Sequence, residues 1–387
     1  MNMSSLEESQ ADAQLLVDGV RRFVQAEVAE HLNAWEEAGE FPRRLYRRVA
    51  ELGWLAMGYP EALGGTPSPW VLRNAMTVAL ARFGGSGGLM ASLFSHNIGL
   101  PPLLRHGSAA LQQEVVPAIL RGEKISALAI TEPGGGTDVM SLRTSARLEG
   151  DEYVVDGEKV FITSGMRADW FTTAVRTNPK DKGPGGISML MVPGDASGIS
   201  RTALKKMGWL CSDTAQLRFD GVRVPARYLV GEEGTGFKMI LTNFNGERLS
   251  MAAMALGFCE CCYDEALAWA RQRKTFGTAL VDHQVIRHKL MDMKMRIEST
   301  RAWLNAVSAR ADADAKGAEW VAEVCLLKNH ATQSMQFCAD QGVQILGAMG
   351  FMRGTACERI YREVKVMMIG GGTEEIMKEL ASRQLGL

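Results

Sequence analysis

The sequence has no long hydrophobic run and almost no net charge. Nowhere do about 18 uncharged apolar residues follow one another, so no membrane-spanning helix is expected. Residues 1–8 are polar and acidic, unlike the basic head and apolar core of a secretory signal. The 43 basic and 44 acidic residues give a formal charge of −1, which argues against nucleic-acid binding because phosphates need a basic surface. These absences predict a cytoplasmic protein.

Cysteine is also scarce, and the cysteines lack the neighbours of a metal site. Seven cysteines among 387 residues do not make a small disulfide scaffold. Cys259, Cys261 and Cys262 are clustered, but no histidine stands at ligand spacing beside them, and the run around them is helical. We interpret them as core or surface thiols and expect no metal, with a zinc site as the less favoured alternative.

Hydrophobic spacing predicts an α+β protein of three parts. An N-terminal helical domain is expected at residues 1–125, a middle antiparallel β domain at 126–235 and a C-terminal helical bundle at 236–387. In the middle part, short runs rich in Val, Ile, Thr and Phe alternate with Gly and Asp turns. At 153–163 and 217–224 an Asp-Gly pair separates two such runs, which predicts two tight hairpins.

Four short motifs are candidates for chemistry, and each has an ordinary alternative. The glycine-rich turn at 130–138 exposes backbone N–H groups that suit a polar ligand, or it is a plain turn. Phe161 and Thr163 could flank a planar ring, or be ordinary strand residues. Glu247, near the start of an apolar helix, could be a reactive carboxylate or a capping group. Three glycines at 370–372 allow close approach to a ligand, or form an inter-helix turn.

Together these motifs resemble the acyl-CoA dehydrogenase family over nearly the whole chain. The matching signatures, in chain order, are Pro-Glu-x-x-Gly-Gly within 58–65, Thr-Glu-Pro-Gly-x-Gly-Thr-Asp at 131–138, Met-Gly-x-x-x-Ser-Asp-Thr at 207–214, Arg-Lys-Thr-Phe-Gly at 273–277, His-Gln at 283–284 and Gln-Ile-Leu-Gly at 344–347. The resemblance implies an acyl-CoA substrate, a role in fatty-acid β-oxidation and electron-transfer flavoprotein as acceptor. It also implies a homotetramer with FAD bound between the β domain and the C-terminal helices.

Carried over residue by residue, the resemblance implies a cofactor site and a substrate site. The implied FAD contacts are Leu128, Ile130, Thr131, Gly136, Thr137, Phe161, Thr163, Arg273, Thr275, Phe276, Gln284, Gln344, Ile345, Gly347, Ala348, Thr373 and Glu375. The implied substrate contacts are Thr137, Asn245, Arg248, Gly371 and Gly372. Arginine suits a pyrophosphate because its planar group donates two hydrogen bonds at once. For Arg248 a structural ion pair is an equal alternative.

The catalytic base departs from the commonest pattern of the family. Many members carry it as the Glu of a Tyr-Glu-Gly-Thr motif, where this chain has Gly-Gly-Gly-Thr at 370–373. In the long-chain and isovaleryl branches the Glu comes from an earlier helix, which the Asn-Gly-Glu-Arg-Leu run at 245–249 matches. The resemblance therefore implies Glu247 as base, with Glu374 in reserve. Residues 371–380, and Phe161 where many members have Trp, resemble the long-chain branch.

The implied reaction is FAD-dependent α,β-dehydrogenation of a long-chain or branched acyl-CoA to the trans-2-enoyl-CoA. Glu247 would remove the α-proton while the β-hydrogen leaves as a hydride. A carboxylate that the acyl chain desolvates has a raised pKa, which improves it as a base near neutral pH. An acyl-CoA oxidase, a flavin monooxygenase and a non-catalytic flavin-binding relative are the alternatives.

Overall fold

The computed structural model describes residues 3–387, with side chains from residue 11 onward. The chain forms two compact units, each built from several segments. The segments of the helical unit are Met1–Trp35, Ser68–Gly87 and Asn245–Leu387. The segments of the sheet unit are Glu36–Pro67 and Gly88–Phe244. The helices α2 (Leu32–Ala38) and α9 (Gly236–Gln272) run from one unit into the other.

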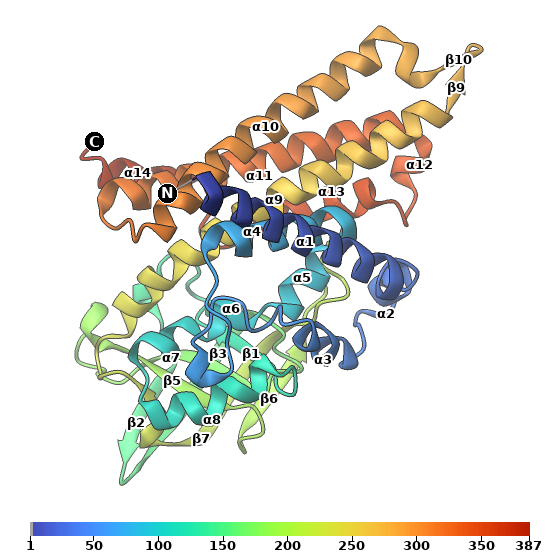
Figure 1. Ribbon diagram of the computed structural model, residues 1–387. Helices are drawn as coiled ribbons and strands as arrows, with labels where there is room; N and C mark the ends of the chain where they lie inside the picture. The colour runs from blue at the N-terminus through green and yellow to red at the C-terminus, as the bar shows by residue number, and fades with distance from the viewer. Residues whose placement is uncertain (1–2) are drawn as a thin grey trace. The chain divides into compact units, whose positions relative to one another are not determined.

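The helical unit is built around α11, against which α10, α13 and α14 pack (Figure 1). Its elements besides α2 and α9 are α1 (Met3–Glu27), α4 (Trp70–Gly84), β9 (Lys274–Thr275), β10 (Thr278–Ala279), η5 (Leu280–Asp282), α10 (Gln284–Asp312), α11 (Ala318–Leu346), α12 (Ala348–Phe351), α13 (Ala356–Ile369) and α14 (Glu374–Gln384). Leu290, Met293, Ile297 and Leu304 on α10 are at most 2% exposed, as their helical spacing predicts. Burying each such side chain contributes roughly 1.5–3 kcal/mol.

A glycine lets α9 pass close to α4. A Cβ atom at Gly257 would lie 2.3 Å from the carbonyl oxygen of Val78 and 2.6 Å from the Cβ of Ala81. The absence of a side chain is therefore what allows these two helices to pack at this distance.

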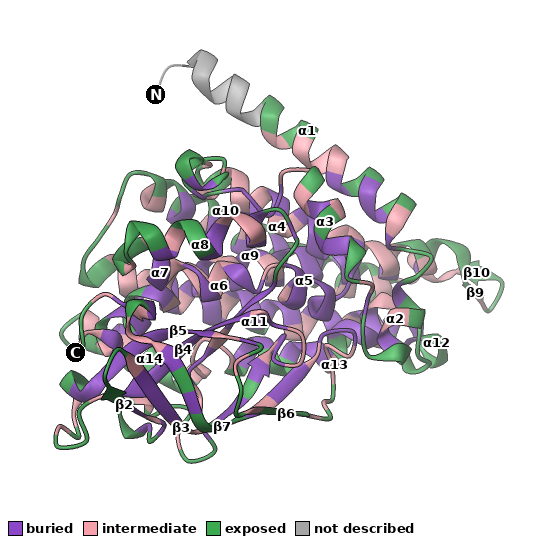
Figure 2. Ribbon diagram, turned by 90° about the horizontal axis from the view of Figure 1, so that it is seen from below, coloured by how far each residue is buried: buried purple, intermediate pink, exposed green. Residues whose placement is uncertain are grey.

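The sheet unit contains one eight-stranded sheet with short helices around it. The strands are β1 (Ser126–Ala129), β2 (Ser145–Glu149), β3 (Glu152–Thr163), β4 (Trp170–Arg176), β5 (Ile187–Pro193), β6 (Ile199–Ala203), β7 (Thr214–Pro225) and β8 (Leu229–Val230). Their order is β6-β7-β3-β2-β4-β5-β8, and β1 pairs with β4. The helices are α3 (Arg44–Glu51), η1 (Glu61–Leu63), α5 (Gly87–Leu93), α6 (His96–Gly99), α7 (Pro101–His106), α8 (Ala109–Leu120), η2 (Val139–Ser141), η3 (Pro184–Gly186) and η4 (Ala226–Tyr228). Strand β4 is buried along its whole length, whereas β6 is partly or fully exposed (Figure 2).

The predicted α+β class is confirmed, with one difference in the sheet. Most strand pairs are antiparallel, but β1 runs parallel to β4 from Ser126 to Ala129. β2 also meets β4 in parallel at a single pair of residues, Ser145 and Arg176. The sheet is therefore mixed, because β1 enters from a helical segment instead of a hairpin.

The two predicted hairpins are wrong, because β3 and β7 are continuous strands that pair with each other. The pairing register shifts between Val155 and Gly157, so the Asp-Gly pair marks a bulge and not a turn. The Asp156 carboxylate accepts a hydrogen bond from the backbone N of Gly221 at 2.8 Å, which joins the two Asp-Gly sites. A Cβ atom at Gly157 would lie 2.6 Å from the Cα of Thr144, so close packing requires this glycine.

The seven cysteines are all buried free thiols. Burial raises the pKa of the clustered thiols at Cys259, Cys261 and Cys262, which keeps them protonated. Among the residues that the structure describes, no group of His, Cys, Asp and Glu side chains could hold a metal ion. Over the same part of the chain, no helix is both long and apolar enough to cross a membrane.

Candidate functional site

A buried carboxylate in the sheet unit fixes the glycine-rich turn at 131–138. Oε1 of Glu132 accepts hydrogen bonds from the backbone N of Thr144 (2.9 Å) and from Nζ of Lys159 (2.8 Å). Its Oε2 accepts one from the backbone N of Arg143 (2.6 Å). Only 8% of the Glu132 side chain and none of the Lys159 side chain is exposed. The turn is thereby anchored to β3 and to the residues that precede β2.

Burial and charge act in opposite directions on this ion pair. Burial raises the pKa of Glu132, but the Lys159 ammonium and the hydrogen bonds outweigh it, so that the carboxyl pKa is lowered. Burial lowers the pKa of Lys159 to about 8, although the Glu132 carboxylate opposes the shift. Both groups are therefore charged at neutral pH, and each needs the other because an unpaired buried charge is strongly unfavourable.

Phe161 presents an aromatic ring to the surface from a strained backbone. Its φ is 61°, in the left-handed region, and 68% of the residue is exposed. The register between β3 and β7 shifts at this point, between Lys159 and Ile162, and such a bulge turns a side chain out of the regular alternation. The backbone N of Val160 donates to the carbonyl of Thr131 at 2.8 Å, which ties the strand to the glycine-rich turn. An exposed, rigidly held ring next to that turn is suited to packing against a flat ligand.

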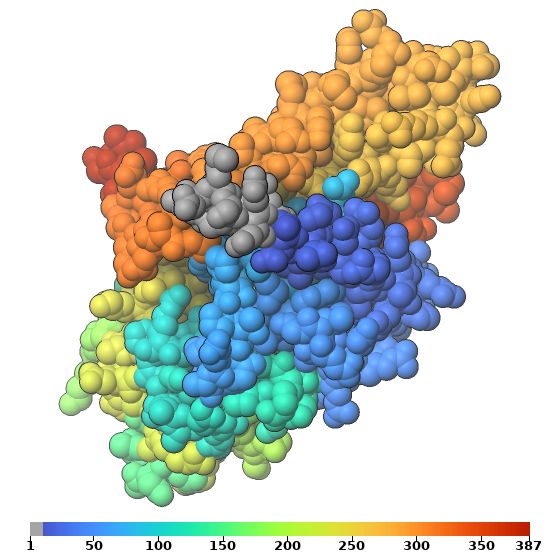
Figure 3. All heavy atoms as spheres, viewed as in Figure 1, coloured from blue at the N-terminus to red at the C-terminus, as the bar shows by residue number. Residues whose placement is uncertain are grey.

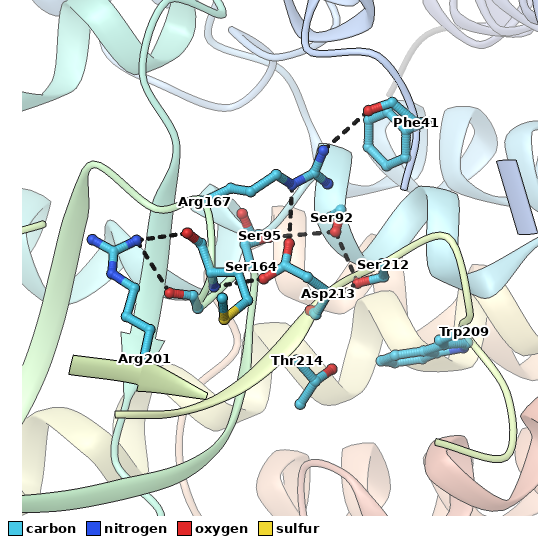
Figure 4. Close-up of polar contacts among 12 residues, drawn as sticks. Phe41, Ser92, Ser95, Ser164, Arg167, Arg201, Trp209, Ser212, Asp213 and Thr214 are labelled. Carbon is cyan, nitrogen blue, oxygen red and sulfur yellow. Dashed lines mark hydrogen bonds and ion pairs between the residues drawn. The ribbon is translucent and has the colours of Figure 1, made fainter. Parts of the chain in front are cut away.

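A polar network holds the turn that follows β3 (Figure 4). Nε of Arg167 donates to the Asp213 carboxylate at 3.0 Å, and the other Asp213 oxygen accepts from the backbone N of Met166 at 2.7 Å. The Ser92 and Ser212 hydroxyls are 2.8 Å apart. The signature at 207–214 therefore contributes to the position of Phe161 through this turn, a structural role that the sequence did not indicate.

The sheet-unit residues named from the sequence differ in exposure. Gly136, Thr137 and Phe161 are exposed, Leu128, Thr131 and Thr163 are partly exposed, and Ile130 is buried. The Ile130 carbonyl accepts a hydrogen bond from Lys159 at 3.0 Å. Ile130 thus belongs to the support of the turn, while its neighbours offer atoms to a ligand.

In the helical unit, the turn between α9 and α10 carries an exposed aromatic ring, as β3 does at Phe161 in the sheet unit. Phe276 is 100% exposed and has a φ of 53°, between the short strands β9 and β10. This segment lies uncovered at the surface of its unit (Figure 3). Thr275 and His283 hydrogen-bond across it at 3.1 Å. Arg273 is exposed and forms no ion pair with any described residue, and Gln284 is exposed at the start of α10. This set combines a free cation, an amide and a ring, as binding a phosphate and a base requires.

The remaining predicted cofactor residues lie at two helix ends. Gln344, Gly347 and Ala348 are exposed where α11 ends, whereas Ile345 is 4% exposed and packs in the core. Thr373 caps α14 by accepting a hydrogen bond from the backbone N of Ile376 at 3.4 Å.

At the same helix end, the backbone N–H of Glu375 itself and the Thr373 hydroxyl lower the pKa of the Glu375 carboxyl group. The Glu375 side chain is exposed and ionised, so it accepts hydrogen bonds and cannot donate them.

Glu247 has a buried carboxylate oxygen for which no described residue supplies a hydrogen bond. Its residue is partly exposed, but Oε2 is shielded from solvent and has no hydrogen bond. Burial raises the pKa of Glu247 to about 7, and the nearby charges of Arg248 and Lys328 only partly oppose the shift. A desolvated carboxyl group that titrates near neutral pH has the properties of a general base.

The glycine turn at 370–372 lies against Glu247. Gly371 and Gly372 have φ angles of 66° and 112°, which glycine adopts readily. A Cβ atom at Gly371 would lie 3.8 Å from Oε1 of Glu247 and 3.1 Å from Sδ of Met251. A side chain at position 371 would therefore point at the space that Glu247 fills. A glutamate at position 371, where many family members carry the base, and Glu247 would thus place a carboxylate in the same region.

Arg248 fastens this turn from α9. Its Nε donates to the carbonyl of Gly371 at 2.9 Å, and Nη1 donates to the side-chain oxygen of Asn245 at 3.2 Å. Arg248 is only 5% exposed, so these hydrogen bonds are shielded from solvent. Within the described chain, the N–H of Gly371 has no acceptor. The turn thus offers a free donor close to a free carboxylate.

Glu374, the reserve candidate for the base, is differently placed. One of its carboxylate oxygens accepts a hydrogen bond from the side chain of Gln333. Its carbonyl accepts one from Nδ2 of Asn329 at 2.9 Å. Glu374 is therefore held to α11, and of these two described carboxylates only Glu247 has a buried oxygen without a hydrogen bond.

The raised pKa of Glu247 predicts a pH-dependent stability. The carboxyl group is protonated in both states well below its ordinary pKa of 4.5, and ionisation disfavours the folded state as the pH rises towards 7. Glu247→Gln removes this penalty, which is at most about 3 kcal/mol. Calorimetry without acyl-CoA should give the variant a higher melting temperature than the native protein near about pH 8 and a smaller advantage near about pH 5. An equal difference at both pH values would contradict the assignment.

Comparisons with known proteins agree with this arrangement. Acyl-CoA dehydrogenase family models match residues 10–123 for the N-terminal domain, 127–222 for the middle domain and 234–386 for the C-terminal domain. The chain is 34% identical over 375 residues to the mitochondrial long-chain specific acyl-CoA dehydrogenase of Rattus norvegicus, covering 95% of this chain and 85% of that one. It is 31% identical over 376 residues to the cyclohexane-1-carbonyl-CoA dehydrogenase of Geobacter metallireducens, covering 97% of each. A crystal structure of a probable acyl-CoA dehydrogenase from Mycobacterium abscessus matches with a TM-score of 0.93 and 44% identity, covering 96% of this chain and 98% of that one. The chain is therefore an enzyme of the acyl-CoA dehydrogenase family.

Proposed function

We propose that this enzyme oxidises the Cα–Cβ bond of an acyl-CoA thioester to the trans-2-enoyl-CoA, with FAD as cofactor and Glu247 as base. The observation that carries the proposal is the unpaired, buried Oε2 of Glu247, whose carboxyl pKa is about 7. The free N–H of Gly371 supports it, because a donor is needed where negative charge develops on the thioester oxygen.

The residues present fit FAD. Phe161 and Phe276 are exposed rings on strained, well-held backbone, and nothing in the fold of either unit requires them to be exposed. Arg273 supplies an unpaired guanidinium for a pyrophosphate. Bound FAD would accept the hydrogen from Cβ as a hydride.

The chain's own residues would handle the proton. Glu247, ionised and shielded from water, would take it from Cα, and Arg248 would keep the glycine turn in place by its 2.9 Å hydrogen bond to Gly371. The Gly371 N–H would stabilise the charge on the thioester oxygen while the proton moves. Asn245 and Gly372 would contact the substrate beside these groups.

The proposal also includes a long or branched acyl group, a homotetramer, and electron-transfer flavoprotein as the electron acceptor. The long acyl group is supported by the name of one relative, which is specific for long chains. The homotetramer is supported by the helical unit, where Phe276, Phe351 and Ile369 expose apolar surface that a partner copy could cover.

Anaerobic titration of the FAD-bound enzyme with butyryl-, palmitoyl- and isovaleryl-CoA tests the reaction. At least one thioester should bleach the flavin absorption and yield the trans-2-enoyl-CoA. No bleaching by any of them would argue for a non-catalytic relative. If the reduced flavin is rapidly reoxidised when oxygen is then admitted, with hydrogen peroxide as product, the enzyme is an oxidase instead.

Phe161→Ala should weaken FAD binding. Aromatic packing contributes about 0.5–1.5 kcal/mol beyond the buried area, so the FAD dissociation constant should rise roughly two- to thirteenfold. Fluorescence titration of the FAD-free protein measures it. Leu148→Ala is the matched control, because Leu148 is also an exposed apolar residue of the sheet, at 52% exposure. Equal affinities for Phe161→Ala and the control would remove Phe161 from the site.

A further inference from the structure

A second buried cation holds the glycine turn, from α11. Lys328 is fully buried, and its Nζ donates to the carbonyls of Met368 at 3.0 Å and Gly372 at 2.8 Å. None of the ion pairs among described residues involves it. Burial, and after it the charge of Arg248, lowers the pKa of Lys328 to about 8, against the opposing effect of Glu374 and other neighbours. An ammonium kept in such a place, at a cost in solvation, is a candidate for a functional role.

The two carbonyls lie on either side of the glycine turn. Met368 belongs to the last turn of α13, where carbonyls lack partners within the helix and the helix dipole favours a cation. Gly372 ends the turn, directly before Thr373 caps α14. One ammonium therefore spans the segment from Met368 to Gly372 and limits its movement.

Resting on the function proposed above, we propose that Lys328 is a positioning residue of the dehydrogenation. It fixes the turn so that the N–H of Gly371 and the carboxylate of Glu247 keep their places relative to each other, and its charge favours the ionised carboxylate. Lys328 touches neither substrate nor flavin in this account. It acts through the turn and through Glu247.

The groups around Glu247 define the electrostatic part of this role. Arg248 on α9 and Lys328 on α11 both lower the pKa of Glu247, while burial raises it more. Lys328 itself faces Glu374 on α14 and Cys325 on its own helix. Removal of Lys328 leaves Arg248 as the remaining cation, so the pKa of Glu247 should rise above about 7.

The test follows the rate of anaerobic flavin reduction against pH in the FAD-bound enzyme, using whichever of butyryl-, palmitoyl- and isovaleryl-CoA reduces the native flavin. Lys328→Met should lower the maximal rate by roughly tenfold or more, because two charge-assisted hydrogen bonds are lost. It should also move the rising limb of the profile to higher pH by on the order of one unit. KM should change less than the maximal rate. Lys328→Arg, which keeps the charge, should restore the position of the rising limb.

Asn329→Ala is the matched control that removes a hydrogen bond to the neighbouring segment without removing a charge. Asn329 is the next residue of α11 and holds the Glu374 carbonyl at 2.9 Å, but it carries no charge. Hydrogen exchange of the backbone amides at 369–373 should accelerate in Lys328→Met, and this readout does not depend on turnover. Asn329→Ala should loosen the adjoining segment and leave the rising limb of the pH profile in place.

Each outcome bears on one proposal. If the native enzyme reduces its flavin, and Lys328→Met shows unchanged amide exchange and an unchanged pH profile, the role of Lys328 is refuted and the dehydrogenase stands. If both lysine and asparagine variants shift the profile equally, the effect is structural and the electrostatic role is refuted. If no acyl-CoA reduces the native flavin, the dehydrogenase proposal itself fails.

Discussion

Glu247→Gln should slow flavin reduction by acyl-CoA by about 100- to 10,000-fold, the range that general bases contribute. Gln fills the same space and leaves the hydrogen bonds of Arg248 to the glycine turn intact, but it cannot accept the α-proton. FAD content and acyl-CoA binding should stay close to native. Stopped-flow absorbance under anaerobic conditions measures the rate, and a spectral titration measures the binding.

Glu374→Gln is the control for this variant. Glu374 is the reserve candidate for the base, and its side chain is hydrogen-bonded to Gln333. The flavin of the Glu374→Gln variant should be reduced by acyl-CoA at a nearly native rate. A fast Glu247→Gln together with a slow Glu374→Gln would transfer the role of base to Glu374.

Glu132→Ala should destabilise the protein by about 3–5 kcal/mol, because it leaves the ammonium of Lys159 buried without a counter-charge. The backbone N–H groups of Arg143 and Thr144 would also lose their acceptor. The turn at 131–138 should loosen, so FAD should be lost more readily during purification. Urea unfolding and the flavin-to-protein absorbance ratio measure the two effects.

The double variant Glu132→Leu with Lys159→Met distinguishes charge from shape. It removes both buried charges and keeps apolar volume, so it should recover most of the lost stability, as replaced buried pairs often do. Equal destabilisation of the single and double variants would show that the hydrogen bonds to Arg143 and Thr144 matter more than the unpaired ammonium.

The fold class and the family could be predicted from the sequence because the signatures are local and ordered. The α+β class needed only periodicity, and Glu247 was predicted as the base because Asn-Gly-Glu-Arg-Leu matches one branch of the resemblance. The prediction of two hairpins was wrong because an Asp-Gly pair favours both tight turns and β-bulges within a strand. The choice between them depends on the partner strand, here β7 beside β3, which is distant in sequence.

The supports of the site could not be predicted for the same reason. Lys159 meets Glu132, and Lys328 meets Gly372, across 27 and 44 positions of sequence. Neither lysine stands in a recognisable motif, and lysine is most often an exposed residue. Similarly, Ile345 lies within a signature that the resemblance assigns to FAD, yet its side chain packs in the core.

A crystal structure of the enzyme with FAD and a non-reactive acyl-CoA analogue would test the central claim most directly. We expect a carboxylate oxygen of Glu247 in contact with the Cα of the thioester, with the flavin on the opposite face and the N–H of Gly371 donating to the thioester oxygen. A Glu247 side chain directed into solvent, or a different carboxylate beside Cα, would contradict the account.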